Sequence, residues 1–459
     1  VPRSDERPMD FFQKATLVGE HVGGYDEWSV DITDAVKSFM ADDQLVKRFK
    51  GKVPLSIRCD NSRDLEMIPS DLSDFNLYGG LYRYLNLVYL PKTSFELIRL
   101  EPELSAGRKE GTVRIKASFY NPEDIREADV IVAIYDADRK QVYSQTVDNV
   151  LSLGNQLLAE AKIKNPALWD VDSPNLYTCE LTVKADGQSL TVSERFGFRQ
   201  FEFKEKGPFF LNGRRLLLRG THRHEDHAGV AQAMTEDMMH TEMQMMKDMG
   251  VNFIRLGHYQ QSDIILRLCD ELGILVWEEI PWCRGGLGGE TYKEQARRML
   301  TNMINQHHNH PSVIIWGLGN ENDWPNDFST FDKGAIRAFM KEQHDLSHRL
   351  DDTRMTAIRR CAFCSDIVDV YSPSIWAGWY RGIFTDYKSV SEEEMKKVKH
   401  FLHVEWGGDS HARRHSENGF ANLKGIESGK GADERDGDAS LYGGAARASK
   451  DGDWSESYV

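Results

Sequence analysis

Beyond residue 210 the sequence alternates between short apolar runs and longer amphipathic runs, and this alternation restricts the possible folds more than any other feature. The apolar runs predict strands at 216–219, 252–256, 275–280, 313–318, 355–358, 368–371 and 401–404. The amphipathic runs predict helices at 236–249, 262–272, 293–308 and 333–349. Strands that alternate with helices form parallel sheets, and so long a succession is typical of a barrel. The pattern therefore predicts a (β/α)8 TIM barrel without its last unit.

From residue 407 onward the chain becomes polar and rich in glycine, and we interpret it as a long loop on the substrate face. No eighth strand is recognisable before residue 459. An open barrel would leave a bare parallel edge, which is costly because its backbone N–H and C=O groups lack partners. We therefore expect that the native protein continues or that another segment closes the gap.

The part of the chain before the barrel has the shorter period of β structure. Alternating runs at 113–120, 130–135 and 177–183, separated by turn-rich pieces, are typical of an antiparallel sandwich. Residues 1–92 also read as β-rich, with glycine pairs at 23–24 and 79–80 marking turns. Three domains are predicted, over residues 1–92, 93–200 and 201–459.

Charge and composition exclude several classes of protein. The chain has 57 basic and 72 acidic residues, a formal net charge of −15, which disfavours nucleic acid as a partner. Charged residues interrupt the apolar runs, so we expect no membrane span. Six cysteines are too few for a disulfide framework, and we interpret Cys361 and Cys364 as inert thiols. The compartment stays open, with the cytoplasm or periplasm of a bacterium expected, and a homo-oligomer is one alternative for the assembly.

Two predicted strands end in a glutamate, which matters because reacting groups of such barrels lie at the carboxyl ends of the strands. Glu321 follows the strand at 313–318 and is flanked by Asn320 and Asn322, and Glu405 follows the strand at 401–404. Cleavage of a glycosidic bond needs two carboxyl groups, one to donate a proton and one to attack the ring carbon. A separation of ~5 to 5.5 Å would mean retention of configuration. A glutamate after a strand is otherwise an ordinary solvated loop residue.

Motifs spread along the chain resemble glycoside hydrolase family 2, which contains β-galactosidases, β-glucuronidases and β-mannosidases. In the first two predicted domains they are Val-Gly-Gly-Tyr at 22–25, Asp-Ile-Thr at 31–33, Leu-Tyr-Gly-Gly-Leu-Tyr-Arg at 77–83, Leu-Trp at 168–169, Ser-Pro-Asn-Leu-Tyr at 173–177 and Phe-Gly-Phe-Arg at 196–199. In the predicted barrel they are Leu-Asn-Gly at 211–213, Arg-Gly at 219–220, Arg-His-Glu at 223–225, Ile-Arg at 254–255, His-Tyr at 258–259 and Asn-His-Pro-Ser at 309–312. The resemblance implies a jelly-roll-like sugar-binding domain, an immunoglobulin-like sandwich and a TIM barrel.

The resemblance also implies roles for individual residues. Glu321, within Gly-Asn-Glu-Asn, would be the acid/base, and Glu405, within His-Val-Glu-Trp, would be the nucleophile. The residues expected to line the terminal-sugar subsite are His224, Arg255, His258 and Asn320. Arg255 could instead be a structural ion-pair partner, and each histidine a hydrogen-bonded core residue.

Some positions depart from the family pattern. The β-galactosidases that use magnesium carry Glu-Thr-His-Gly after the third strand, whereas this chain has Glu-Glu-Ile-Pro-Trp-Cys-Arg at 278–284, so we expect no required metal and no cofactor. A tyrosine often found beneath the nucleophile is replaced near Trp376. We expect Trp376 or Trp379 to stack on the sugar, Trp406 to contact it beside Glu405, and Trp282 and Trp324 to stand around the mouth.

The prediction from sequence is thus a retaining exo-β-glycosidase that removes a terminal sugar from an oligosaccharide. We expect a β-galactosidase, whose substrate could be an unusual oligosaccharide such as one from algal galactans. The alternative within the family is a β-glucuronidase, which needs a cation for the sugar carboxylate, and Arg284, Arg359 and Arg360 are the candidates. A carbohydrate-binding protein without turnover is the alternative from another class.

Overall fold

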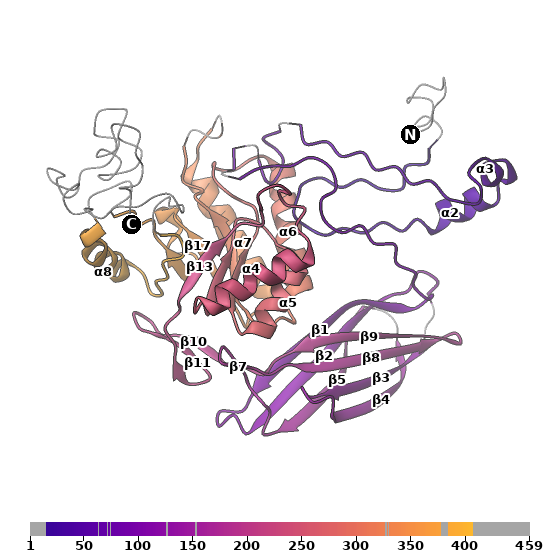
Figure 1. Cartoon of the computed structure of the whole chain (residues 1–459), viewed down its shortest axis with the longest axis horizontal. Coiled ribbons are helices and arrows are strands. Elements are labelled where there is room, and N and C mark those ends of the chain that lie inside the picture. The colour runs from indigo at the N-terminus through magenta and orange to yellow at the C-terminus, as the bar shows by residue number, and fades with distance from the viewer. Residues whose placement is uncertain are drawn as a thin grey trace.

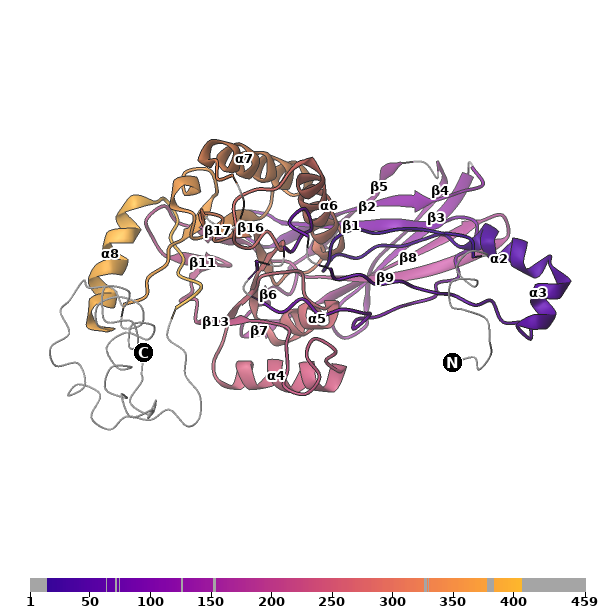
Figure 2. The same cartoon turned by 90° about the horizontal axis from the view of Figure 1, so that it is seen from above.

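The structure is a computed structural model, and it describes residues 15–406 apart from 63, 71, 74, 125–126, 152–153, 326–327, 329 and 378–383. Three regions are visible: an extended N-terminal stretch, a β-sandwich, and a parallel sheet covered by helices (Figure 1). The sandwich lies beneath the helix-covered sheet, and the N-terminal stretch passes over both (Figures 1 and 2). Among the described residues, no helix combines the length and the apolar character that crossing a bilayer requires.

The parallel sheet contains six strands that are neighbours in the order in which they occur along the chain. They are β13 (Gly220–Arg223), β14 (Phe253–Leu256), β15 (Leu275–Glu279), β16 (Val313–Asn320), β17 (Met355–Arg359) and β18 (Val370–Ser372). Every neighbouring pair is parallel. This order is that of a TIM barrel, in agreement with the predicted fold class.

The first and last predicted strands differ from the structure because side chains take over backbone hydrogen bonds there. Residues 217–219 lie outside the regular strand: the Asn252 side chain accepts from Arg219 N at 2.8 Å and donates to Leu217 O at 3.0 Å, while the Arg219 carbonyl accepts from Asn252 N at 2.9 Å. At the other end Phe401 forms only an isolated bridge to Tyr371. Val404 N then donates to the Ser372 hydroxyl at 3.1 Å instead of to a strand. The first strand of the sheet therefore begins at Gly220, later along the chain than the predicted strand at 216–219. The strand predicted at 401–404 forms a single bridge, at Phe401.

Five helices follow β13 in the part of the chain that the structure describes, of which three begin at a capping side chain. They are α4 (Glu236–Asp248), α5 (Asp263–Leu272), α6 (Glu290–His307), α7 (Lys333–Leu350) and α8 (Tyr387–Lys397), with short 3-10 turns at Ala362–Cys364 and Phe384–Asp386. Thr235, Ser262 and Asp332 accept the first free backbone N–H groups of α4, α5 and α7. Gly273 ends α5 at a φ of 67°, a left-handed conformation that glycine adopts without strain.

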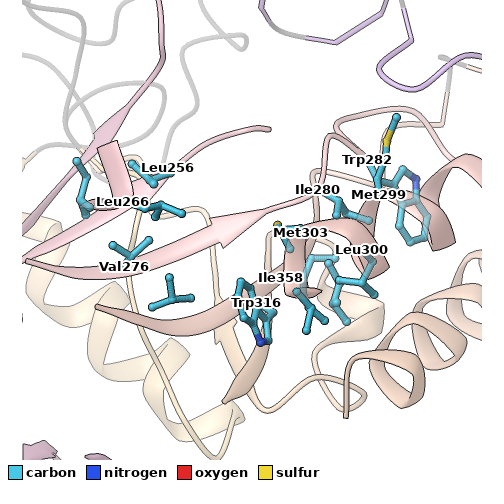
Figure 3. Close-up of a cluster of buried hydrophobic side chains, with 14 of the residues drawn as sticks. Leu256, Leu266, Val276, Ile280, Trp282, Met299, Leu300, Met303, Trp316 and Ile358 are labelled. Carbon is cyan, nitrogen blue, oxygen red and sulfur yellow. The ribbon is translucent and has the colours of Figure 1, made fainter. Parts of the chain in front are cut away.

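A hydrophobic core joins the helices to the sheet. Figure 3 shows Leu256, Val276, Trp316 and Ile358 from the strands together with side chains of α5 and α6, such as Leu266, Met299, Leu300 and Met303. Trp282 belongs to this cluster, is fully buried, and packs edge-on against Phe339. The expectation that Trp282 stands at the mouth of the barrel was wrong, because the loop after β15 turns its indole inward.

The sandwich consists of two antiparallel sheets around one core. One sheet contains β1 (Ser94–Leu104), β2 (Glu110–Tyr120) and β5 (Asn155–Lys164); the other contains β4 (Gln141–Leu151), β3 (Glu127–Tyr135), β8 (Tyr177–Ala185) and β9 (Gln188–Phe196). Burial alternates along β2, as expected for a strand with one face on a core. Short strands at Trp169–Asp170, Ser173–Pro174, Phe201–Phe203, Phe209–Leu211 and Arg214–Arg215 lead to the barrel.

The N-terminal stretch does not form the strands that the sequence predicts. Within the described part of 15–92 the regular elements are two short helices, α2 (Thr33–Met40) and α3 (Asp43–Arg48), and no strand. Apolar side chains such as Leu87 (65% exposed) and Tyr89 (87%) are not covered by a second layer. A strand is stable only when neighbours accept its hydrogen bonds and cover one face. The jelly-roll-like domain and the domain boundaries at 92 and 200 stay predictions.

Candidate active site

The two glutamates singled out in the sequence lie at the same end of the sheet. Glu321 directly follows β16, is 5% exposed, and its backbone N donates to Arg359 O at 3.0 Å. Its φ is 54°, in the left-handed region that non-glycine residues rarely occupy. The Glu405 side chain is 30% exposed. Backbone strain of this kind persists only where the surroundings fix it, and it is concentrated at functional sites.

One guanidinium group connects the two carboxylates. Arg359, the last residue of β17, contacts Oε1 of Glu321 through Nη1, and its Nη2 lies 2.9 Å from Oε1 of Glu405. The two contacted oxygens are therefore separated by no more than two short polar contacts and the width of one guanidinium. That separation is below the upper limit of ~9.5 Å for carboxylate pairs in glycosidases.

Arg255 connects the opposite sides of the sheet. It lies on β14, and its Nη1 donates to Oε2 of Glu405 at 2.9 Å. Glu405 follows the segment beyond β18, so five strand spacings separate the two residues along the sheet, or ~24 Å if the sheet were flat. Contact at 2.9 Å requires the sheet to curl, as in a barrel.

The same arginine organises the residues predicted to bind the terminal sugar. Arg255 is fully buried and donates to both oxygens of Glu279 at 3.0 and 2.8 Å. Its Nη2 also donates to the side-chain oxygen of Asn320 at 2.9 Å. His258 Nδ1 lies 2.8 Å from Glu279 Oε1. Arg255 thus holds Glu405, Asn320 and His258 in one network. Its ion pair with Glu279 also fits the alternative role, that of a structural ion-pair partner.

Three histidines line the wall next to Glu405. The ring centroids of His222, His224 and His258 lie 4.8 to 5.1 Å apart. Burial lowers the pKa of all three, and the positive charge of Arg255 lowers it further, so the rings are neutral near pH 7. Neutral rings can donate to and accept from sugar hydroxyl groups.

The three histidines could in principle hold a metal ion, since their nitrogens lie within 4.8 Å of one another. Arg255, whose guanidinium is within 3.1 Å of His258 Nδ1, opposes a cation there through charge repulsion. A second group with metal-ligand chemistry is His344, His348 and Asp369, where Asp369 accepts from the backbone N of Thr356 in β17. In that group His348 is hydrogen-bonded to Asp369 at 2.8 Å.

The electrostatics of Glu321 differ from those expected of a proton donor. Burial raises the pKa of its carboxyl group, but Arg359, the Trp324 indole and Arg360 together lower that pKa to about 2. Trp324 Nε1 donates to Oε2 at 2.9 Å, and Arg360 Nη1 donates to Oε1 at 3.1 Å. In this state the carboxyl is ionised at neutral pH, so it can accept a proton and has none to donate.

The tryptophans predicted from sequence fall into different environments. The Trp376 ring lies 5.4 Å from the Arg359 guanidinium, at the edge of the site, whereas Trp406 is 62% exposed. Trp379 lies outside the described residues. Trp324, one of the tryptophans expected around the mouth, contacts Glu321 directly. It therefore lies beside the candidate acid/base.

The N-terminal stretch also reaches the site, which the sequence did not predict. The Phe75 ring lies 4.8 Å from Tyr259 and 6.3 Å from His224, and Tyr25 stacks on Tyr259 at 4.1 Å. Arg83 Nη2 lies 2.8 Å from Glu225 Oε1. A hollow of about 700 Å³ opens beside these contacts, between residues 76–78 and the loop 226–231.

Other site residues were missed because their role depends on contacts between distant segments. Glu279 was part of a run noted only as a departure from the family, yet it pairs with Arg255. His222 lies 3.9 Å from Glu405 Oε2 and was not singled out. The position of both at the carboxyl end of a predicted strand was the available signal. Arg359 was predicted as a cation for a sugar carboxylate, whereas here it joins the two glutamates.

Comparisons with protein families agree with this arrangement. The model described as glycosyl hydrolases family 2, TIM barrel domain, matches residues 201–417, and the model described as glycosyl hydrolases family 2 matches residues 93–199. The solved structure of Parabacteroides merdae β-glucuronidase is 80% identical in sequence, with a TM-score of 0.91, over 97% of this chain and 55% of that one.

More distant relatives carry two different names. A putative β-glucuronidase of Formosa agariphila is 42% identical over 96% of this chain and 51% of its own length. A β-galactosidase of Thermoanaerobacterium thermosulfurigenes is 30% identical over 77% of this chain and 47% of its own length. This chain thus spans about half the length of these relatives. Its two matched family models, its ordered motifs and its curled parallel sheet lead to one conclusion: the chain belongs to glycoside hydrolase family 2.

Proposed function

We propose that the protein is a retaining exo-β-glucuronidase in which Glu405 is the nucleophile and Glu321 the acid/base. The observation that carries the choice of sugar is the 80% identity, over 97% of this chain, with Parabacteroides merdae β-glucuronidase. The relatives named β-galactosidase are about 30% identical, so the comparisons favour glucuronide over the galactoside expected from the sequence. The cation-rich site supports the same choice, because a uronic acid brings a carboxylate that a galactoside lacks.

The contacts of Glu405 suit a nucleophile. Arg255 and Arg359 each place a guanidinium nitrogen 2.9 Å from one of its oxygens, and both charges stabilise the carboxylate form that must attack the anomeric carbon. In the first step Glu405 forms a bond to that carbon while the glycosidic oxygen leaves with a proton from Glu321. Glu321 must take up that proton beforehand, which requires the entering substrate to weaken the contacts of Arg359 and Arg360 with its carboxylate. In the second step Glu321 takes a proton from water, which displaces Glu405 and releases the sugar.

The remaining residues would bind and orient the terminal sugar. The Asn320 amide is fixed by Arg255 and is adjacent to Glu321, a position suited to the sugar 2-hydroxyl, whose hydrogen bond strengthens in the transition state. Neutral His224 and His258 would contact other hydroxyl groups. Arg284, Arg359 and Arg360 are the candidates for the cation that binds the sugar carboxylate, and Arg359 lies beside both glutamates.

The test is a panel of nitrophenyl β-glycosides with the full-length protein. We expect cleavage of the β-glucuronide, with kcat/KM at least about 100-fold above that for the β-galactoside, because discarding a buried charge partner costs a few kcal/mol. Glu405→Ala should abolish turnover, and added azide should restore release of nitrophenol by attacking in place of the missing carboxylate. Preference for the galactoside would overturn the choice of sugar. A complete absence of turnover with every glycoside would favour the carbohydrate-binding alternative.

A further inference from the structure

Two histidines and an aspartate come together between α7 and the strands that follow it. His344 and His348 lie one helical turn apart on α7, and their ring centroids are 4.6 Å apart. Asp369 directly precedes β18, and its Oδ2 lies 2.8 Å from His348 Nε2. One nitrogen of each histidine and one oxygen of the carboxylate lie within 4.8 Å of one another. We call these three residues the α7 cluster.

The α7 cluster is separate from the candidate active site. Thr356, the second residue of β17, donates its backbone N–H to Asp369 Oδ2 at 2.8 Å. Arg359, the last residue of the same strand, contacts Glu321 and Glu405. Three residues of extended strand separate Thr356 from Arg359, a distance of ~10 Å. The cluster therefore lies toward the amino ends of the strands, and the glutamates lie at the carboxyl ends.

Thr356 orients two members of the cluster. Its hydroxyl oxygen lies 2.9 Å from Asp369 Oδ2 and 2.8 Å from His344 Nδ1. The hydroxyl has one proton and an ionised carboxylate can only accept, so the hydroxyl donates to Asp369 and accepts from His344 Nδ1–H. In the neutral ring His344 Nε2 then has a free lone pair. Histidines that bind metals are oriented in this way, by donation from the ring nitrogen that does not bind the ion.

The carboxylate also has an oxygen available for a ligand. Thr356 and His348 both bind Oδ2 of Asp369, whereas Oδ1 accepts no hydrogen bond from the residues that the structure describes. The side chains of His348 and Asp369 are 31% and 26% exposed, so water and ions can reach them. An ion bound to both would displace the proton that they share, and water would complete its coordination.

The charge around the α7 cluster differs from that around the histidines of the candidate active site. There Arg255 lies 3.1 Å from His258 Nδ1 and repels a cation. Asp369, by contrast, is paired with His348 and, within the described ranges, with no lysine or arginine. Lys341, on the same helix as the two histidines, is paired with Asp345. The negative charge of Asp369 is therefore available to a cation.

We propose that the α7 cluster binds a divalent transition-metal ion, and that Zn²⁺ suits it best. Imidazole nitrogens and a carboxylate oxygen are ligands typical of zinc, whereas Ca²⁺ and Mg²⁺ prefer sites made of oxygen. The ion would join α7 to β17 and β18, because both histidines belong to the helix and Thr356 holds Asp369. It would stabilise the barrel and take no part in the reaction, for which no metal is expected.

The experiment measures binding of Zn²⁺ to the full-length protein, prepared without a histidine tag and treated with a chelator. Calorimetric titration with zinc chloride should show a site that binds one ion per chain. At free Zn²⁺ about 100-fold above Kd, the melting temperature should rise by about 3 °C or more. Ca²⁺ and Mg²⁺ at the same concentration should leave the melting temperature unchanged.

The decisive variants are His344→Gln and His348→Gln. A glutamine amide can replace the hydrogen bonds that the two rings donate, but it is a poor ligand for zinc. Each variant should weaken Zn²⁺ binding at least about tenfold and remove the rise in melting temperature. Thr356→Val removes the orienting hydroxyl without removing a ligand and should also weaken binding about tenfold. The control is His240→Gln, because His240 is an exposed histidine on α4, and its Zn²⁺ affinity should equal that of the wild type.

Two results would overturn the proposal: no effect of Zn²⁺ on the melting temperature of the wild type, or equal Zn²⁺ affinity in the wild type and in both histidine variants. The cluster would then be an ion pair that joins helix and sheet without a metal. Substitution by Co²⁺ gives a further readout, since its visible absorption bands should be lost in His348→Gln. Binding and melting need no turnover, so the result is independent of the proposed glucuronidase activity.

Discussion

The two ends of the parallel sheet both contain buried charges, but they use them differently. At the carboxyl ends of the strands, Arg255 and Arg359 contact Glu405, and Arg359 and Arg360 contact Glu321, in a region with strained backbone. At the amino ends, Arg354 contacts Asp351 at 2.8 Å and donates to the carbonyls of Val313, His308 and His310. The first network is open to an incoming ligand, whereas the second ties loops and strands together.

The difference teaches that ion pairs alone do not identify an active site. The network at the amino ends of the strands, which we call the lower network, contains further hydrogen bonds within the protein: Asp351 also accepts from Trp316 Nε1 at 2.9 Å, and His310 is 2.6 Å from Asp270. In the network at the carboxyl ends, which we call the upper network, Arg359 is shared by two carboxylates that must later contact a substrate. We therefore expect substitutions at the upper end to reduce activity and those at the lower end to reduce stability.

The largest expected effect is on catalysis. Glu405→Gln keeps the shape of the side chain and removes its charge, so kcat for a nitrophenyl β-glucuronide should fall at least about 10⁴-fold. The free energy of unfolding, measured in denaturant, should change by less than about 1 kcal/mol, because Arg255 keeps both contacts to Glu279. A large loss of stability with this variant would contradict the expectation that the carboxyl ends of the strands serve catalysis and the amino ends serve stability.

The next effect is on stability. Arg354→Ala leaves Asp351 as a buried carboxylate without its ion-pair partner, and such losses cost about 3 to 5 kcal/mol. Denaturant unfolding measures this loss, while kcat/KM of the folded fraction at low temperature should stay close to that of the wild type. If kcat/KM fell as strongly as with Glu405→Gln, the lower network would have to be assigned a catalytic role.

A pH-dependent effect is expected at His310. Burial lowers its pKa, but Asp270 and Asp263 outweigh burial and raise that pKa to about 10. A pKa raised by folding stabilises the folded protein fully below ~6.5, the value in the unfolded chain, and the contribution is lost as the pH rises through about 10. The melting temperature should therefore decline between these values. His310→Gln should lower it at pH 6 and flatten the decline, and an unchanged slope would show that the His310–Asp270 pair does not contribute.

The smallest expected effect separates local capping from the upper network. Asp332 caps α7 by accepting from the backbone N–H groups of Gly334 and Ala335 at 2.7 and 3.1 Å. Asp332→Ala should cost about 1 kcal/mol of unfolding free energy, as expected for a lost N-cap. In the part of the chain described, Asp332 has no ion pair with the arginines that contact Glu321 and Glu405, so kcat/KM should not change. Asp332→Asn is the matched control that keeps the cap.

The sequence predicted those parts of the fold that depend on local pattern. The apolar runs at 275–280 and 313–318 became β15 and β16, and Glu321 and Glu405 came to the same end of the sheet because parallel strands end at one edge. By contrast, no strand forms at 217–219, where the Asn252 side chain binds Arg219 N and Leu217 O. Such an exchange depends on a contact between segments far apart in the sequence, which periodicity does not encode.

The site was predicted in the same uneven way. Single residues at strand ends were found, but their partners were not: the shared position of Arg359 depends on the curl of the sheet, and that of Phe75 depends on how the N-terminal stretch crosses the barrel. The strands expected at 1–92 show the same limit. A β-like sequence needs a neighbouring strand before it forms a sheet, and no strand is present in the described part of 15–92.

Arg359 has a consequence for inhibitor design. Because its guanidinium stands between the two glutamates, it already supplies the positive charge that an iminosugar cation would bring to them. Such an inhibitor must evict a resident cation before it gains any Coulomb attraction, so part of its usual advantage over a neutral lactone is cancelled. A compound that bears both a ring cation and a carboxylate would give the displaced arginine a new partner and should recover that advantage.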